Sequence, residues 1–111
     1  AISTETDNEY VEPLIQEVYH EIDRLHQKPV SAEELTIVRN YMLGEMCRSY
    51  ESPFSLSDAW IFIATSGLDD DYFSRSLLAV NEVTPMEIQD LAQRYLCKET
   101  LKEVIAGKKL S

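Results

Sequence analysis

The sequence predicts an α+β fold in which five helices pack on one face of a sheet and the chain ends in a short strand. Helix-start signals followed by apolar residues at helical spacing recur along the chain. The apolar run Val104–Ala106, which ends at Gly107, has the composition of a buried strand. Because a single strand cannot satisfy its own backbone hydrogen bonds, most of the sheet is expected to lie upstream of residue 1.

The first expected elements are the end of a strand over residues 1–6 and a long helix from about residue 7 to Lys28. Pro13 leaves the start of the helix open by several residues, because proline fits only near the first turn. Pro29 ends the helix, since the residue before a proline disfavours helical backbone. The apolar face of this helix consists of Val11, Leu14, Ile15, Val18, Ile22 and Leu25.

A second helix is expected from Ser31 to about Tyr50. Ser31 is its N-cap and Glu34 the reciprocal partner in a capping box. Gly44 weakens the helix by about 1 kcal/mol relative to alanine, and suggests the close approach of another helix. The expected core stripe consists of Leu35, Val38, Met42 and Met46.

Ser52 and Pro53 predict the start of a third helix, which runs to about Ser66 and stops at a left-handed Gly67. Its apolar residues cover most of the circumference, so this helix is expected to be the most buried of the five. On the same argument Trp60 is a core residue, not a platform on which a ligand stacks.

A fourth helix follows the acidic run Asp69–Asp71, whose charge suits the positive end of a helix dipole. The run lacks the alternation, glycine and terminal glutamate of a calcium loop, so capping is the preferred interpretation. The expected core face consists of Phe73, Leu77 and Val80.

The fifth helix has the most complete start signal. Thr84 is the N-cap, Pro85 the first helical residue and Glu87 the capping-box partner, while Val83 can pack on Ile88. The apolar face that follows consists of Ile88, Leu91, Ala92 and Tyr95.

The composition limits the partners. Twenty acidic residues against ten basic ones give a formal charge of −10, which repels phosphate and disfavours nucleic acid and anionic membrane surfaces. No signal peptide and no apolar run of membrane length is present, and nothing in the sequence indicates a compartment. Cys47 and Cys97 are expected to be buried free thiols, although a disulfide stays open.

The residues of this chain do not form a recognisable catalytic motif. His20 and His26 are six residues apart on one helix, so their imidazoles point about 120° apart and cannot share a metal ion. The glycines are dispersed, and no serine lies in a GxSxG elbow. Each of Arg39, Arg48, Arg75 and Arg94 has an acid nearby in sequence, so surface ion pairs are expected.

Three stretches together resemble one known family. They are VSAEELTIVRNYMLGEM (Val30–Met46), SGLDDDYFSRSLLAVNEVTPMEIQDLAQRYL (Ser66–Leu96) and LKEVIAGKK (Leu101–Lys109). Each stretch alone is generic, whereas their order and spacing are similar to those of the pitrilysin/insulinase-type zinc metallopeptidases, the inverzincins. The resemblance extends from about Thr4 to Lys109.

The resemblance implies a repeated α+β domain, pairs of which enclose a chamber where peptides are cleaved. The family's zinc ligands and base lie in an HxxEH motif with a further glutamate downstream, and no part of this chain matches either. An arginine–tyrosine pair that grips substrate would lie upstream of Ala1. Residues 1–111 are therefore expected to be the C-terminal helical portion of one such domain, in the non-catalytic half, and no catalytic, cofactor-binding or metal-binding residue is assigned.

The expected function is that of a non-catalytic C-terminal segment of a zinc-dependent metallopeptidase. It forms the wall of the cleavage chamber and packs against the catalytic half, in the same chain or in a partner subunit. The segment is inactive on its own and holds no cofactor, while zinc and peptide substrates belong to the full-length enzyme or the partner subunit. A homodimer is also possible. Two alternatives stay open: a free-standing acidic helical interaction module with no proteolytic role, and a related subunit that has lost catalysis.

Overall fold

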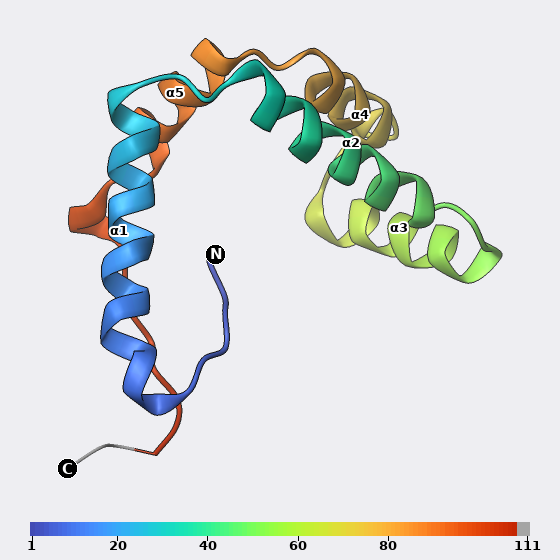
Figure 1. The fold of residues 1–111 in the computed structure, drawn as a ribbon. Helices are drawn as coiled ribbons and strands as arrows, with labels where there is room; N and C mark the ends of the chain where they lie inside the picture. The colour runs from blue at the N-terminus through green and yellow to red at the C-terminus, as the bar shows by residue number, and fades with distance from the viewer. Residues whose placement is uncertain (109–111) are drawn as a thin grey trace. The chain divides into compact units, whose positions relative to one another are not determined.

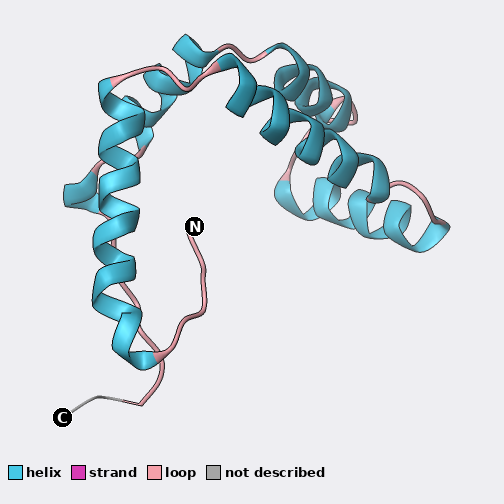
Figure 2. Cartoon of the chain, in the orientation of Figure 1, coloured by secondary structure: helices cyan, strands magenta, loops and turns pink. Residues whose placement is uncertain are grey.

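The computed structural model describes residues 1–108, and in this part of the chain every regular element is helical (Figures 1 and 2). Residues 109–111, which include the end of the third resembling stretch, lie outside the described residues. The elements are the 3-10 helix η1 (Asn8–Tyr10), the α-helices α1 (Val11–Gln27), α2 (Ala32–Arg48), α3 (Pro53–Ser66), α4 (Tyr72–Glu82) and α5 (Pro85–Tyr95), and the 3-10 helix η2 (Lys98–Thr100).

The α+β prediction is wrong, because residues 1–108 contain no strand. Residues 1–6, expected to end a strand, are irregular, and so are residues 101–106. At Leu101 the backbone is extended, as the sequence favours there, but an extended segment becomes a strand only when it exchanges hydrogen bonds with a neighbour. Val104 is instead 92% exposed. The sequence anticipated the number of helices and most of their boundaries.

The chain divides into two compact units. Unit 1 consists of Ala1–Pro29 together with the chain from Met86 onward, and contains α1 and α5. Unit 2 is Val30–Pro85 and contains α2, α3 and α4. Each unit has a very small core. The only buried apolar residues among those described are Ile22 and Ala92 in unit 1 and Leu35 and Ile63 in unit 2.

Unit 1 holds α5 against the end of α1 through polar side chains. The side-chain amides of Gln89 and Gln93 both donate to the backbone carbonyl of His26, at 2.9 and 2.8 Å. The His26 Nε2 lies 2.9 Å from the Ala92 carbonyl oxygen. The two glutamine bonds satisfy a carbonyl of the last turn of α1, which has no partner within its own helix.

The segment after α5 returns along α1. The Lys98 ammonium pairs with the Asp23 carboxylate and lies 5.7 Å from the centre of the Tyr19 ring. The Tyr19 hydroxyl donates to the Glu103 carboxylate at 2.6 Å. This bond to a carboxylate, with desolvation and the carboxylate's charge as smaller causes, raises the pKa of Tyr19 above its usual range.

In unit 2, α2 and α4 lie side by side (Figure 1). The guanidinium of Arg39 on α2 donates to the backbone carbonyls of Val80, at 3.0 Å, and Val83 at the end of α4. The side chain therefore caps a helix that has no glycine at its C-terminus. Tyr50 and Phe73 add an edge-to-face ring pair with centroids 5.2 Å apart.

The ends of α3 follow the sequence signals closely. Ser52 accepts a bond from the Ser55 amide, and the Ser55 hydroxyl accepts one from the Ser52 amide, both at 3.1 Å. This is a capping box with serine in place of the usual glutamate. Gly67 ends the helix in the left-handed conformation, with φ of 65°.

The prediction that α3 is the most buried helix is wrong. Of its apolar side chains only Ile63 is buried, whereas Phe54 is 83% exposed and Trp60, the predicted core residue, 54% exposed. The physical reason is that α3 is apolar on every side, whereas the other helices of unit 2 cover only one side of it. Other predicted core positions that are exposed are Val38, Met42, Leu77, Leu91 and Tyr95.

Candidate functional site

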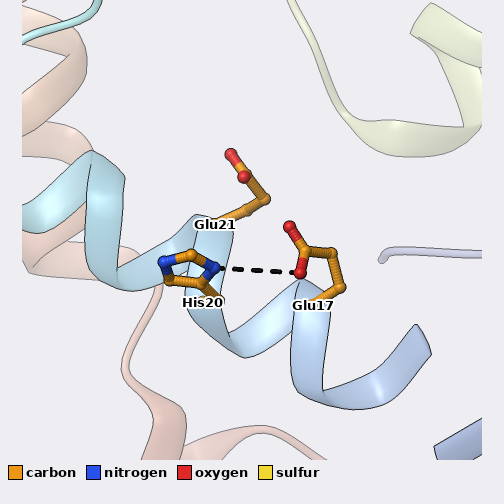
Figure 3. A group of neighbouring side chains, drawn as sticks. All are labelled: Glu17, His20 and Glu21. Atoms are coloured by element: carbon orange, nitrogen blue, oxygen red, sulfur yellow. Dashed lines mark ion pairs between the residues drawn. The ribbon is translucent and has the colours of Figure 1, made fainter. Parts of the chain in front are cut away.

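The acidic and histidine side chains of α1 form the one group within residues 1–108 with the geometry to meet around a metal ion. Glu17, His20 and Glu21 lie on one face of the helix, and a ligand atom of each lies within 4.8 Å of the others (Figure 3). The His20 Nδ1 is 3.8 Å from a Glu17 carboxylate oxygen. His26 is not part of this group.

This group lacks the features of a zinc site. All three side chains are exposed, so water competes for every ligand atom. The Arg24 guanidinium binds the Glu21 carboxylate at 2.6 Å, which a metal ion would have to displace. A zinc-binding imidazole is normally oriented by a hydrogen bond to its second nitrogen, and residues 1–108 supply no such partner to His20. We interpret the group as charge pairing on a helix surface and assign no metal site to it.

The acidic run before α4 also lacks a ligand site. Asp69, Asp70 and Asp71 line a wide, shallow hollow of about 500 Å³ together with Leu68. Asp71 directly precedes α4, as expected, but its side chain makes no capping hydrogen bond. It binds the Arg75 guanidinium at 3.1 Å, and Asp69 lies 3.8 Å from the same group. The predicted capping role is therefore replaced by an ion pair.

The cysteines and arginines complete the comparison with the sequence. Both cysteines are free thiols, but Cys47 is exposed, contrary to the prediction, and Cys97 is partly buried. Arg48, Arg75 and Arg94 form the expected surface ion pairs, with Glu45, Asp71 and Asp90 respectively. Arg39 does not, because it caps α4.

The feature that stands out is the apolar surface of unit 2. On α3 it comprises Phe54, Leu56, Trp60, Ile61 and Phe62, all exposed, which we call the α3 surface. The other two helices of the unit add further exposed apolar side chains: Ile37, Val38, Tyr41, Met42, Leu77 and Leu78. Large exposed apolar areas on a protein mark places where another molecule binds. The α3 surface is therefore the candidate functional site.

Charges of one sign accompany the α3 surface. Residues 51–74, which comprise α3 and the turns on either side of it, contain five acidic residues and no lysine, arginine or histidine. The five are Glu51, Asp58, Asp69, Asp70 and Asp71. Arg75, the first residue after this range, contacts Asp69 and Asp71, so the charge beside α3 is net negative but partly paired. An apolar helix beside an excess of carboxylates suits a protein partner and is unsuited to a phosphate-bearing one.

Comparisons of this chain with protein-family models, with curated proteins and with solved structures find no match. Among the helices of residues 1–108, none is both long enough and apolar enough to span a bilayer.

The α3 surface could be recognised in the sequence only in part. Eight apolar residues among the fourteen of α3 marked the helix as unusually hydrophobic, with Asp58 its one charged residue. Hydrophobicity alone does not say whether the covering surface belongs to the same chain or to another molecule. For Trp60 the sequence prediction assumed a covering surface in the same chain, whereas the structure leaves that side chain in contact with solvent.

Proposed function

We propose that this chain is a non-catalytic segment of a zinc-dependent metallopeptidase, which forms part of the wall of the peptide-cleavage chamber and packs against the catalytic half. The observation that supports a packing role is the exposure of the apolar side chains of unit 2. Apolar surface left in contact with water costs about 25 cal/mol per Å² relative to buried surface. A partner protein that covered these side chains would remove this cost. The metallopeptidase assignment is supported by the three resembling stretches.

The chain contributes no catalytic group in this proposal. Within residues 1–108 we assign no nucleophile, acid–base pair or metal site, and zinc belongs to the catalytic half. The prediction for the purified chain is that zinc titration gives no stoichiometric site of about micromolar affinity, and that His20→Ala changes nothing in the titration. A tight single site lost in the His20 variant would contradict this part of the proposal.

The proposal is tested by joining the chain to a catalytic half. The HxxEH-containing protein encoded in the same gene or beside it is expressed with and without this chain, and cleavage of a quenched fluorescent peptide is followed. We expect cleavage by the pair, loss of cleavage on chelation, and no cleavage by this chain alone. The proposal is wrong if no HxxEH-containing protein binds the chain, or if removing the chain leaves cleavage unchanged.

Two substitutions of equal charge locate the contact. Phe54→Asp places a carboxylate on the α3 surface, whereas Gln16→Asp places one on the exposed side of α1. We expect the first to weaken association with the catalytic half by at least about tenfold, since an apolar interface core excludes an unpaired charge. The second serves as the control.

A second function is favoured by the charge around the α3 surface. An apolar helix bordered by carboxylates is also what an acidic helical interaction module, free of any proteolytic role, presents to its partner. The two functions differ in the identity of the bound protein. A partner that lacks HxxEH, together with no effect on peptide cleavage, supports the interaction module.

A further inference from the structure

The outward side of α3 has the layout of a helix-binding surface. Phe54 and Ile61 are seven residues apart, so they lie on the same side of the helix two turns from each other. They are 83% and 58% exposed, and Asp58, four residues after Phe54, lies on the same side; Trp60, 54% exposed, points about 100° away from Ile61 around the helix. Apolar anchors spaced by whole turns are how one helix receives the apolar side of another.

The charges beside these anchors are unbalanced. The nearest basic residues on either side of residues 51–74 are Arg48, which pairs with Glu45, and Arg75, which pairs with Asp71. Asp58, on α3 itself, and Asp70 form no ion pair with any of the described residues. Arg75 also contacts Asp69, so two of the five carboxylates are paired within the chain, whereas Asp58 and Asp70 are not. The α3 surface is therefore an apolar area that carries an unpaired carboxylate, Asp58.

This charge decides between the possible occupants. A second copy of the chain would bring its own unpaired carboxylates, Asp58 among them, against those of the first, and like charges across an interface are destabilising. An anionic membrane surface or a nucleic acid is repelled for the same reason. A partner with lysine or arginine beside an apolar stripe satisfies both features at once, because basic side chains reach the carboxylates while their methylene stems cover apolar surface.

We propose that the α3 surface binds a basic amphipathic helix of a partner protein, whose apolar stripe packs on Phe54 and Ile61 and whose lysines or arginines face Asp58. This inference names the chemistry of the partner and rests on the proposed packing role only in that another protein covers α3. The metallopeptidase assignment is not needed for it.

The chain carries its own probe, because Trp60 is its single tryptophan. The full chain is titrated with a helical peptide that has leucines on one face and lysines on the other, and with the same peptide carrying glutamate in place of lysine. We expect the lysine peptide to shift Trp60 emission to the blue and the glutamate peptide to have no effect. Raising the salt from about 0.1 M to about 1 M should weaken the lysine peptide about tenfold, as the Debye length falls from about 10 Å to about 3 Å.

Substitutions separate the apolar contact from the charge. Phe54→Ser combined with Ile61→Ser removes two exposed anchors and should abolish the blue shift, with the helix content by circular dichroism unchanged. Asp58→Asn should weaken the lysine peptide severalfold. Glu12→Gln removes the same charge from α1 in unit 1, so it controls for net charge and should leave binding unchanged.

Several outcomes overturn the inference. Equal binding of the two peptides, binding that salt does not weaken, or an effect of Glu12→Gln as large as that of Asp58→Asn would each show that the charge around α3 selects nothing. A blue shift that grows with the concentration of the chain alone would assign the surface to self-association. If the catalytic half binds the α3 surface and the lysine peptide does not, the packing role stands and the basic-helix inference is wrong.

Discussion

Units 1 and 2 are stabilised in different ways. In unit 1 polar side chains join the elements. Two glutamines of α5 and a histidine of α1 connect these two helices at the end of α1. A lysine–aspartate pair and a tyrosine–glutamate bond connect the segment after α5 to α1 farther along. In unit 2 one arginine caps α4, aromatic rings pack at the end of α2, and a whole helix keeps most of its apolar side chains in solvent. Unit 2 also exposes more large apolar side chains than unit 1, which supports the proposal that unit 2 binds another protein.

Removing buried atoms is expected to have the largest effect. Ile22 and Ile63 are each 3% exposed, one in each unit, so Ile22→Ala and Ile63→Ala should each lower the free energy of unfolding by about 2–5 kcal/mol. Hydrogen exchange followed by mass spectrometry should show the greatest loss of protection in the unit that carries the change. The exposed Ile37→Ala is the control, with an effect within about 0.5 kcal/mol.

The Arg39 cap is expected to come next. Arg39→Met removes a charged donor from two carbonyls at the end of α4 and should destabilise unit 2 by about 2 kcal/mol. Arg75→Met removes a surface ion pair on the same helix and should change stability by less than about 1 kcal/mol. Equal effects of the two substitutions in urea unfolding, followed by Trp60 fluorescence, would show that Arg39 is only another surface cation.

Alanine substitutions at two glycines of unit 2 should change the free energy of unfolding in opposite directions. Gly67 has a φ of 65°, so Gly67→Ala forces a left-handed conformation on alanine and should destabilise by about 1–2 kcal/mol. A Cβ at Gly44 meets no atom within 4 Å, so the close helix approach that the sequence suggested there is absent within the described residues. Gly44→Ala should therefore stabilise by about 1 kcal/mol. Thermal unfolding of both variants measures the difference.

The smallest effect concerns tyrosine ionisation. The Glu103 hydrogen bond raises the pKa of Tyr19 in unit 1, while burial is the main cause that raises the pKa of Tyr50 in unit 2. In the folded chain the pKa of each of these two tyrosines lies above the ordinary value of about 10. The neutral phenols therefore stabilise the fold at pH values below about 10, and this stabilisation is lost as the pH rises through the folded pKa.

Glu103→Gln separates the two tyrosines. It should return the pKa of Tyr19 toward its ordinary value and leave that of Tyr50 unchanged, as measured by nuclear magnetic resonance of ring-labelled tyrosine. Glu99→Gln is the matched control, since Glu99 contributes nothing to the pKa of Tyr19. A Tyr19 pKa that does not respond to Glu103→Gln would mean that the bond between Tyr19 and Glu103 is not formed in solution.

The local features of this fold were predictable from the sequence, because a few neighbouring residues determine them. Ser31 accepts a bond from the Glu34 amide, Gly67 is left-handed, and Pro85 is the first residue of α5. The start of α1, left open because of Pro13, is resolved by a 3-10 turn before Val11.

Features that depend on a distant partner were not predictable. Residues 101–106 favour extended backbone, but strand formation needs a second strand, and burial of α3 needs a covering surface. The role of Arg39 had a signal that was missed: it lies four residues after Leu35 and three before Met42, within the apolar stripe of α2, whereas a surface arginine lies on the polar face. The spacing of Glu17, His20 and Glu21 was also visible, since residues three and four apart share a helix face.

The most direct test of the central claim is the accessibility of Trp60. Quenching of its fluorescence by acrylamide, a neutral molecule that the acidic surface does not repel, is measured for the chain alone and for the chain bound to the HxxEH-containing half. If another protein covers the α3 surface, Trp60 is quenched efficiently in the free chain and is protected in the complex. Equal quenching in the two states would contradict the claim that unit 2 is the interface.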